Sequence, residues 1–286
     1  GDELVGYGMA TALMSTFRFG ASARLTVRRD GSLLVETAAH EIGSGAHTML
    51  AQIAASELGI PIERVEVVLG DTTLPEAGGT FGSATTLSVG SAVEIAGRRL
   101  RARLDELAGE PGLEPREYPD LLALHRLDRV SEEGIWAPRR EDNAFAMAAF
   151  GAVFVEVRVG RIVPVARVTR AVGVYSAGRI ISPVLARSQV VGGIIWGLGQ
   201  ALTEGSRIDP LTGGFLGKGF GGYHVPCAAD IPAIEVEFVA EDDRRASPLG
   251  ARGVGEIGTI GVGAAVANAI FNATGHRHRS LPIEPR

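Results

Sequence analysis

One glutamate near the C-terminal end of the sequence is surrounded by residues without side chains. Five glycines flank Glu256, just before an apolar segment: Gly253, Gly255, Gly258, Gly261 and Gly263. Because glycine has no Cβ, a bulky ligand can approach both the backbone and the carboxylate, and glycine also tolerates positive φ angles. A solvated glutamate in a glycine-rich turn would give the same pattern. The other loops of the chain must therefore decide between these two interpretations of Glu256.

Three further glycine-rich loops occur, at residues 43–45, 78–86 and 213–222. The first two, like the Glu256 loop, lead into segments whose apolar residues have helical spacing. Backbone N–H groups and helix N-termini bind anions. We therefore predict that the loops together hold a large anionic ligand.

The common nucleotide and zinc motifs match these loops poorly. Residues 213–218 resemble a P-loop, but the motif is one residue short and Gly219 replaces its Ser or Thr. Residues 253–258 match G-x-G-x-x-G, yet no strand directly precedes them and no ribose-binding acid can follow. His40-Glu41 begins a zinc-binding H-E-x-x-H motif, but Ser44 replaces the second histidine. A generic nucleotide-binding domain remains an alternative.

The elements that position the loops mix strand and helix patterns without regular β-α-β alternation, which predicts an α+β fold. Asp30-Gly31 predicts a hairpin, and a helix follows Gly45. The helix after Gln189 is too rich in glycine to be stable without close packing or a ligand. We predict two subdomains of mixed sheets with packed helices, at residues 1–112 and 143–286, joined by a charged, proline-bearing connector at 113–142.

Composition limits the partners. The 286 residues carry a formal charge of −5, so no broad basic field favours nucleic acid or an anionic membrane. The longest apolar tract, residues 190–202, is shorter than the roughly 18 residues of a membrane span. We expect a soluble, cytoplasmic protein and leave a periplasmic location open. Cys227 is the only cysteine, so this chain alone carries no disulfide and no four-cysteine iron-sulfur cluster. The sequence begins without Met, and its natural N-terminus is expected to be missing or cut.

Four motifs occur in the order found in the molybdenum hydroxylases. They are Glu41 to Thr48, Gly82 to Thr85, Ala177 to Pro183 with Ala186 to Gln189, and Gly253 to Glu256. The chain resembles the second half of the molybdopterin-binding subunit of the xanthine dehydrogenase and aldehyde oxidase enzymes, over nearly its whole length. It is most similar in kind to bacterial aldehyde dehydrogenases with separate iron-sulfur, flavin and molybdenum subunits.

The resemblance implies oxidation or hydroxylation of an aldehyde or an N-heterocycle, with water as the oxygen source. Glu256 matches the base that accepts the proton of the attacking hydroxyl, and we expect it to be buried. The molybdenum is held through the pterin, so no residue of this chain is implied as a metal ligand. The implied cofactor-binding residues are Ile42, Gly43, Ser44, Gly45, Gly82, Ser83, Ala84, Thr85, Gln189, Val254 and Gly255. Many relatives have glutamine in place of Ser44, which leaves a side-chain bond to the pterin open there.

The resemblance also implies cofactors and partners. The expected cofactor is molybdenum-molybdopterin, with a cytosine dinucleotide form possible, while iron-sulfur clusters and FAD belong to partner chains or domains. The first half of the molybdenum subunit must be a separate chain or a missing segment. A small molecule is the substrate, and aromatic contacts could come from Phe220 or Tyr223, although we expect these to pack in the core. A cofactor-binding module without turnover is a further alternative.

Overall fold

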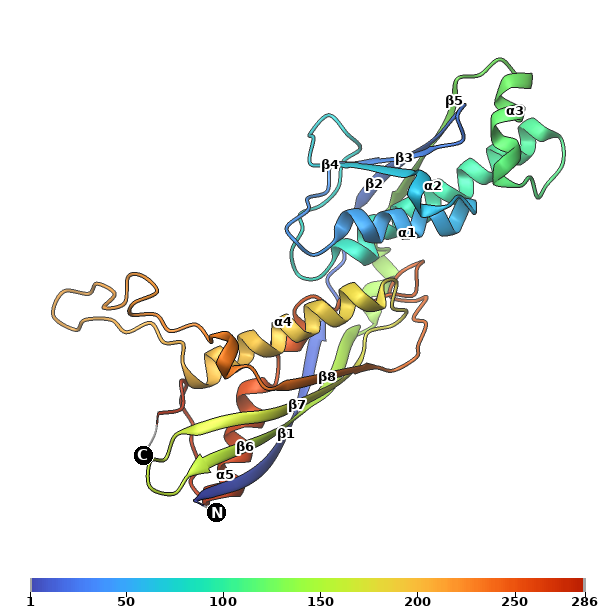
Figure 1. Cartoon of the computed structure of the whole chain (residues 1–286). Helices are drawn as coiled ribbons and strands as arrows, with labels where there is room; N and C mark the ends of the chain where they lie inside the picture. Colours follow the sequence, from blue (N-terminus) through green and yellow to red (C-terminus); the bar gives the residue numbers. More distant parts are fainter. Residues whose placement is uncertain (1, 285–286) are drawn as a thin grey trace.

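Residues 2–284 are described by a computed structural model, in which eight strands and five α-helices form two lobes (Figure 1). One sheet has the order β4-β3-β2-β5 and the other the order β1-β6-β7-β8. The strands are β1 (Glu3–Ser15), β2 (Ala21–Arg28), β3 (Leu33–Thr37), β4 (Val65–Leu69), β5 (Arg129–Trp136), β6 (Ala148–Gly160), β7 (Ala166–Ser176) and β8 (Ala233–Phe238). The helices are α1 (Ala46–Leu58), α2 (Thr85–Ala108), α3 (Tyr118–Leu124), α4 (Pro183–Leu202) and α5 (Val262–Thr274). The predicted α+β class is confirmed.

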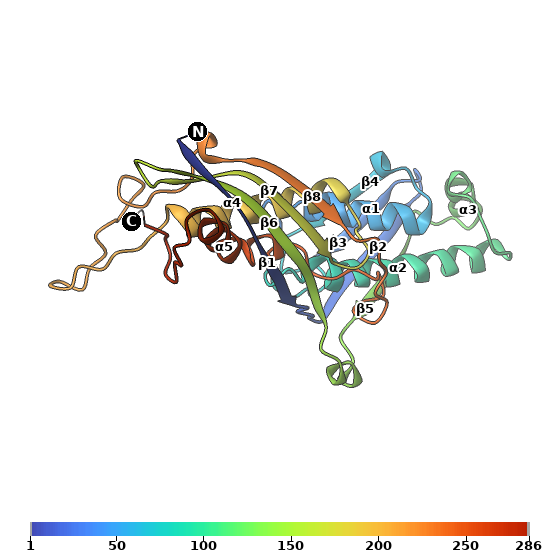
Figure 2. The same ribbon diagram turned by 90° about the horizontal axis from the view of Figure 1, so that it is seen from below.

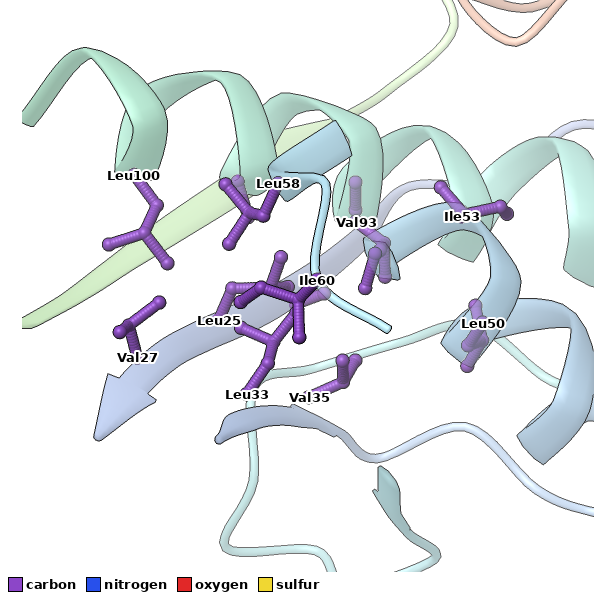
Figure 3. Close-up of a cluster of buried hydrophobic side chains, with 14 of the residues drawn as sticks. Leu25, Val27, Leu33, Val35, Leu50, Ile53, Leu58, Ile60, Val93 and Leu100 are labelled. Carbon is purple, nitrogen blue, oxygen red and sulfur yellow. The ribbon is translucent and has the colours of Figure 1, made fainter. Parts of the chain in front are cut away.

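The lobe around β2 folds as its local sequence signals indicate. The turn at Asp30-Gly31 joins β2 and β3 as an antiparallel pair, and Gly31 has a φ of 77°. Inward-facing residues of these strands alternate with half-exposed ones, and α1 and α2 cover them. Figure 3 shows the result, with Leu25 and Leu33 of the sheet packed against Leu50 and Val93 of the helices.

The lobe around β6 places α4 and α5 against the sheet. Gly6 and Gly8 of β1 allow α5 to approach closely, since a Cβ on Gly8 would lie 2.2 Å from the carbonyl oxygen of Ala265. Within residues 2–284, one stretch, Ile257–Thr274, is long and apolar enough to cross a membrane. A core helix passes the same test, and the buried residues of α5 belong to the core of this lobe.

Strand pairing joins segments that the predicted boundaries of 1–112, 113–142 and 143–286 place apart. The first strand pairs along its whole length with β6, from Glu3 opposite Gly160 to Ser15 opposite Ala148. The predicted connector contains β5, which pairs with β2. The charged sequence of β5 reflects an edge strand with one face in water, while Gly134 lets α2 approach its other face. The chain therefore crosses between the lobes after β1 and again before β6.

Candidate functional site

A cavity of about 420 Å³ lies where the two lobes meet, and the four sequence motifs line it together. Ten of the predicted site residues contribute to its wall: Ile42, Ser44, Gly45, Gly82, Ser83, Thr85, Gln189, Val254, Gly255 and Glu256. Gly43 and Ala84 are not in the lining. Ala84 is fully buried, and Gly43 has open space where a Cβ would stand.

The loop at 213–222 does not reach this cavity, which corrects the prediction that it helps to hold the ligand. None of its residues is among those lining the cavity, within the described part of the chain. It belongs to a long excursion after α4 that extends away from the lobe in both views (Figures 1 and 2). Asp209 closes a turn there with Leu211 and Thr212, and Gly213 has a φ of 69°. These glycines serve a surface turn.

Three helix N-termini meet at the cavity. The first turns of α1, α2 and α4 contribute Ala46, Thr85 and Ala186 to its wall. In the described structure no N-cap side chain of these three helices makes a capping hydrogen bond. The first N–H groups of a helix lack intrahelical partners, and such ends attract anions. Arg179 also lines the cavity and adds positive charge, whereas the charge of Arg252, another lining residue, is paired with Glu241 and Asp243. The site is thus built for a ligand with an anionic part.

Ser83 connects the loop before α2 with the Glu256 loop. Its hydroxyl donates to Glu256 Oε2 at 3.2 Å and accepts the N–H of Glu256 at 3.0 Å. Ser83 has a φ of 57°, which is uncommon for a residue other than glycine. A Cβ on Gly253 would lie 2.9 Å from Ser83 Cβ, and one on Gly255 would lie 3.0 Å from Ser83 Oγ. These two glycines therefore allow Ser83 to pack against the loop.

The structure corrects the expected burial of Glu256, because the residue is exposed in this chain. Its carboxylate borders the cavity and is oriented by Ser83, but no described part of the chain covers it. The sequence predicts that the surrounding glycines let a ligand approach and tolerate positive φ angles. Their contacts show that part of their role is close packing between the two loops.

Glu41 organises the loop before α1, although sequence reasoning did not single it out. Its Oε1 accepts the N–H groups of Gly43 at 2.7 Å and Gly45 at 3.1 Å, and its Oε2 accepts that of His47 at 3.2 Å. Burial by itself raises the pKa of Glu41, but the hydrogen bonds from these three N–H groups outweigh it and lower the pKa below its ordinary value of 4.5. In the sequence, the signal for this role is a glutamate with glycines two and four positions after it, at Gly43 and Gly45.

We expect the loop at 41–47 to lose order in acid. Because the folded-state pKa of Glu41 is lowered, the stabilisation is fully present above pH 4.5 and is lost as the pH falls through the lower folded value. The protection factors of the Gly43 and Gly45 amides, which correct for the intrinsic exchange rate at each pH, should be high at neutral pH and lower below that value. The variant Glu41→Gln should show low protection factors throughout, without this acid-dependent step, and should differ from the parent only above that pH. Equal protection in both proteins would contradict the assignment.

Close packing explains the glycine-rich α4, as the sequence required. A Cβ on Gly193 would lie 2.9 Å from backbone atoms of Gly258 and Thr259, in the 3₁₀ turn Ile257–Thr259 (η5) that follows Glu256. A Cβ on Gly197 would lie 2.6 Å from Val262 Cβ. Gly192, in contrast, has nothing within 4 Å. One side of α4 therefore sets the position of the Glu256 loop.

Two adjacent glycines of α4 should respond oppositely to alanine. Gly192→Ala should stabilise the chain by about 0.5–1 kcal/mol, because alanine restricts the unfolded chain and meets no neighbour. Gly193→Ala should destabilise it by about 1–3 kcal/mol, because the added methyl group overpacks the contact with Gly258. Chemical denaturation of both variants measures the difference. Equal effects would mean that η5 does not rest on α4.

Arg252 anchors the start of the Glu256 loop. The residue is 8% exposed, and its guanidinium donates to Ser176 Oγ at 2.6 Å and to the carbonyl oxygen of Ala148 at 2.9 Å. It also pairs with Glu241. Ala148 is the first residue of β6 and Ser176 is the last residue of β7, so Arg252 holds the loop against the sheet. Sequence analysis missed this residue, because its partners are distant in the chain.

Aromatic residues after α4 differ from the expected core packing. Phe220 is 82% exposed. Tyr223 is half-buried and donates its hydroxyl to Glu204 Oε2 at 2.7 Å. Tyr223 and Trp196 line a second cavity of about 330 Å³, and Trp196 also lines the first. Among residues 2–284, no group of three His, Cys, Asp or Glu side chains is placed to hold a metal ion.

Comparison with known proteins identifies the family. The molybdopterin cofactor-binding domain family matches residues 2–232, and this chain belongs to it. The chain is 37% identical to the aldehyde oxidoreductase molybdenum-binding subunit PaoC of Escherichia coli K12, over 99% of this chain and 40% of PaoC. It is 30% identical to the putative xanthine dehydrogenase molybdenum-binding subunit XdhA of the same organism, over 93% of this chain and 38% of XdhA. The chain thus spans about two fifths of these relatives.

The fold has a counterpart among solved structures. The aldehyde oxidoreductase of Desulfovibrio gigas matches 99% of this chain and 32% of its own chain, with a TM-score of 0.83 and 23% identity. This likeness confirms the fold. The predicted relationship to the molybdenum-binding subunits of the aldehyde oxidoreductase and xanthine dehydrogenase family is likewise confirmed.

Proposed function

We propose that this chain forms much of the molybdopterin site of an enzyme that oxidises an aldehyde or hydroxylates an N-heterocycle, with water as the oxygen source. The observation that carries the proposal is the meeting of the N-terminal ends of α1, α2 and α4 with Glu256 at one cavity. Family membership supports the cofactor, and the names of the two Escherichia coli relatives support the reaction class.

The residues of the cavity fit this cofactor. The N–H groups at the start of α2, together with Ser83, Thr85 and Gly82, would hold its phosphate, and a Cβ at Gly82 would crowd Phe17 at 3.1 Å. The loop at Ile42, Gly43, Ser44 and Gly45 would contact the cofactor beside α1. Gln189, Val254 and Gly255 would contact the pterin from the other lobe. The short Ser44 leaves the contact at that position to the backbone.

Glu256 would act as the general base of the reaction. The bound molybdenum cofactor would supply the two-electron acceptor and would activate an oxygen that comes from water. In the balanced reaction, a substrate C–H and one water give C–OH, two protons and two electrons. The carboxylate of Glu256 would accept one proton, and the hydrogen bond from Ser83 Oγ to Oε2 would hold it in position.

The remaining predictions concern the whole enzyme. We propose that iron-sulfur and flavin groups on partner chains or domains remove the electrons, because this chain has one cysteine. The cytosine dinucleotide form of the pterin and a cytoplasmic location also remain proposals. The name of a further relative, a 6-hydroxypseudooxynicotine dehydrogenase complex subunit of Paenarthrobacter nicotinovorans, supports a complex.

The reaction class can be tested with isotopes. The chain is purified with the rest of its complex and supplied with an N-heterocycle in ¹⁸O-labelled water, without O₂, and with an artificial electron acceptor. We expect a hydroxylated product that carries the label. A product with unlabelled oxygen, or turnover that requires O₂, would contradict the proposal. Bound cofactor without turnover on N-heterocycles and on a series of aldehydes would favour the cofactor-binding module.

A further inference from the structure

The β1 and β6 part of one face of the β1-β6-β7-β8 sheet exposes several large apolar side chains. Six large apolar side chains on this face are between 45% and 68% exposed: Val5, Tyr7, Met9, Leu13, Phe150 and Phe154. We call them the outer patch. The first four occupy alternate positions of β1, and the last two belong to β6. Alternation in a strand places such residues on one side of the sheet.

The strand register joins these side chains into one surface. Met9 lies opposite Phe154, and Leu13 lies opposite Phe150, so the patch crosses from β1 to β6. The intervening residues of β1 face the helices, as shown by the contacts of Gly6 and Gly8 with α5. The helices therefore cover the other face of the sheet. Contiguous exposed apolar surface of this kind marks an interaction site.

The edge of β1 is less available than its face. The N–H of Tyr7 donates to Asn272 Oδ1 at 2.9 Å, and Asn268 Nδ2 donates to the carbonyl oxygen of Met9 at 2.9 Å. Side chains of α5 thus occupy backbone groups that an added strand would need. A partner would bind over the outer patch through side-chain packing.

We propose that the outer patch is the docking surface for the remaining part of the molybdenum-binding subunit, the part that the relatives carry and this chain does not span. This inference rests on the proposed function. The matched region is 40% of PaoC and 32% of the Desulfovibrio gigas enzyme, so in these relatives it is joined to a larger body of protein. Permanent interfaces between protein parts are more apolar than the rest of the protein surface, so the outer patch is suited to pack against this larger part of the subunit.

The outer patch also leads to the functional site. The strand β1 ends at Ser15, and the half-exposed Phe17 lies so close to Gly82 that a Cβ there would be 3.1 Å from its ring. A polypeptide that covers Leu13 and Phe17 would therefore border the cavity where Glu256 is now exposed. Docking would both bury the outer patch and complete the surroundings of the base.

The test measures binding between this chain and the rest of the subunit. The polypeptide from the same source that corresponds to the unmatched part of PaoC is produced separately, and its affinity is measured by calorimetry. The triple variant Met9→Gln, Leu13→Gln, Phe154→Gln should bind at least about tenfold more weakly, because buried apolar anchors dominate such interfaces. The control Leu124→Gln, at a position that is 77% exposed on α3, should bind like the parent. Circular dichroism and thermal melting establish that both variants are folded.

Two outcomes of the binding measurement decide against the proposal. If the folded triple variant binds like the parent, the outer patch is not the docking surface. If the parent instead forms a dimer that the triple variant cannot form, while both bind the subunit equally, a second copy is the occupant. Molybdenum and pterin content of the parent complex is measured in parallel. If the triple variant binds more weakly but the parent complex lacks the cofactor, the proposed function is contradicted and the docking surface stands. If the parent complex holds the cofactor but the triple variant binds like the parent, the docking surface is contradicted and the proposed function stands.

Discussion

The variant Glu256→Gln should retain its cofactor and lose most of its turnover. Glutamine keeps the size of the side chain and can still interact with Ser83, but it cannot accept a proton. We expect turnover to fall by about 10²–10⁴-fold, the usual loss when a positioned base is removed. Steady-state kinetics on the complete complex, expressed per bound molybdenum, measure this effect. Substrate affinity should change much less.

A matched substitution separates the role of this carboxylate from a general effect of charge. Glu63→Gln removes an exposed glutamate from the β2 lobe and should leave turnover within a few-fold of the parent. A structural role for Glu256 would instead give loss of protein or cofactor, and a solvated glutamate would give no change. A fully loaded Glu256→Gln enzyme with turnover close to the parent would remove the assignment of Glu256 as the base.

The variant Gly82→Val should fold and should lose the molybdopterin. Gly82 lines the cavity beside the α2 N-terminus, and a Cβ there would lie 3.1 Å from Phe17, so valine should displace the loop backbone that we propose holds the phosphate. Its φ of 61° also makes valine unfavourable, and that strain needs its own control. Molybdenum analysis and thermal melting of the purified complex measure the two effects separately.

Gly31→Val provides that control. Gly31 has a φ of 77°, and a Cβ there would lie 3.2 Å from Pro119, so the strain and crowding are similar to those at Gly82. Gly31 lies in the hairpin turn, outside the cavity lining. We expect both variants to lose stability by a similar amount and only Gly82→Val to lose the cofactor. Normal molybdenum content in Gly82→Val would mean that this glycine merely ends a turn.

The sequence predicted those parts of the fold that depend on neighbouring residues. The Asp30-Gly31 hairpin and the helix after Gly45 are confirmed, because turn chemistry and apolar spacing act over a few residues. The helix predicted to follow the loop at 78–86 is also present, and it begins inside that loop at Thr85. The pairing of β1 with β6 was missed, because more than 130 positions of chain separate the partners and no local pattern encodes it.

The candidate site shows the same division. Two of the predicted loop-helix junctions, those before α1 and α2, lie at the cavity, whereas the third helix N-terminus there belongs to α4 and not to the helix after the Glu256 loop. The loop at 213–222 was assigned wrongly, since glycine serves surface turns as well as ligand contacts. The anchoring of Arg252 by Ser176 and Ala148 could not be predicted, because those partners come together only in the folded sheet.

Molybdenum and pterin content of the purified complex most directly tests whether this chain holds the cofactor. The complex is analysed for metal by mass spectrometry, and the released organic ligand is identified in the same sample. We predict close to one molybdenum per chain, together with a released molybdopterin whose mass also shows whether a cytosine dinucleotide is attached. A folded, complete complex that oxidises its substrate without molybdenum, or that releases an ordinary nucleotide in place of a pterin, would contradict the proposed site.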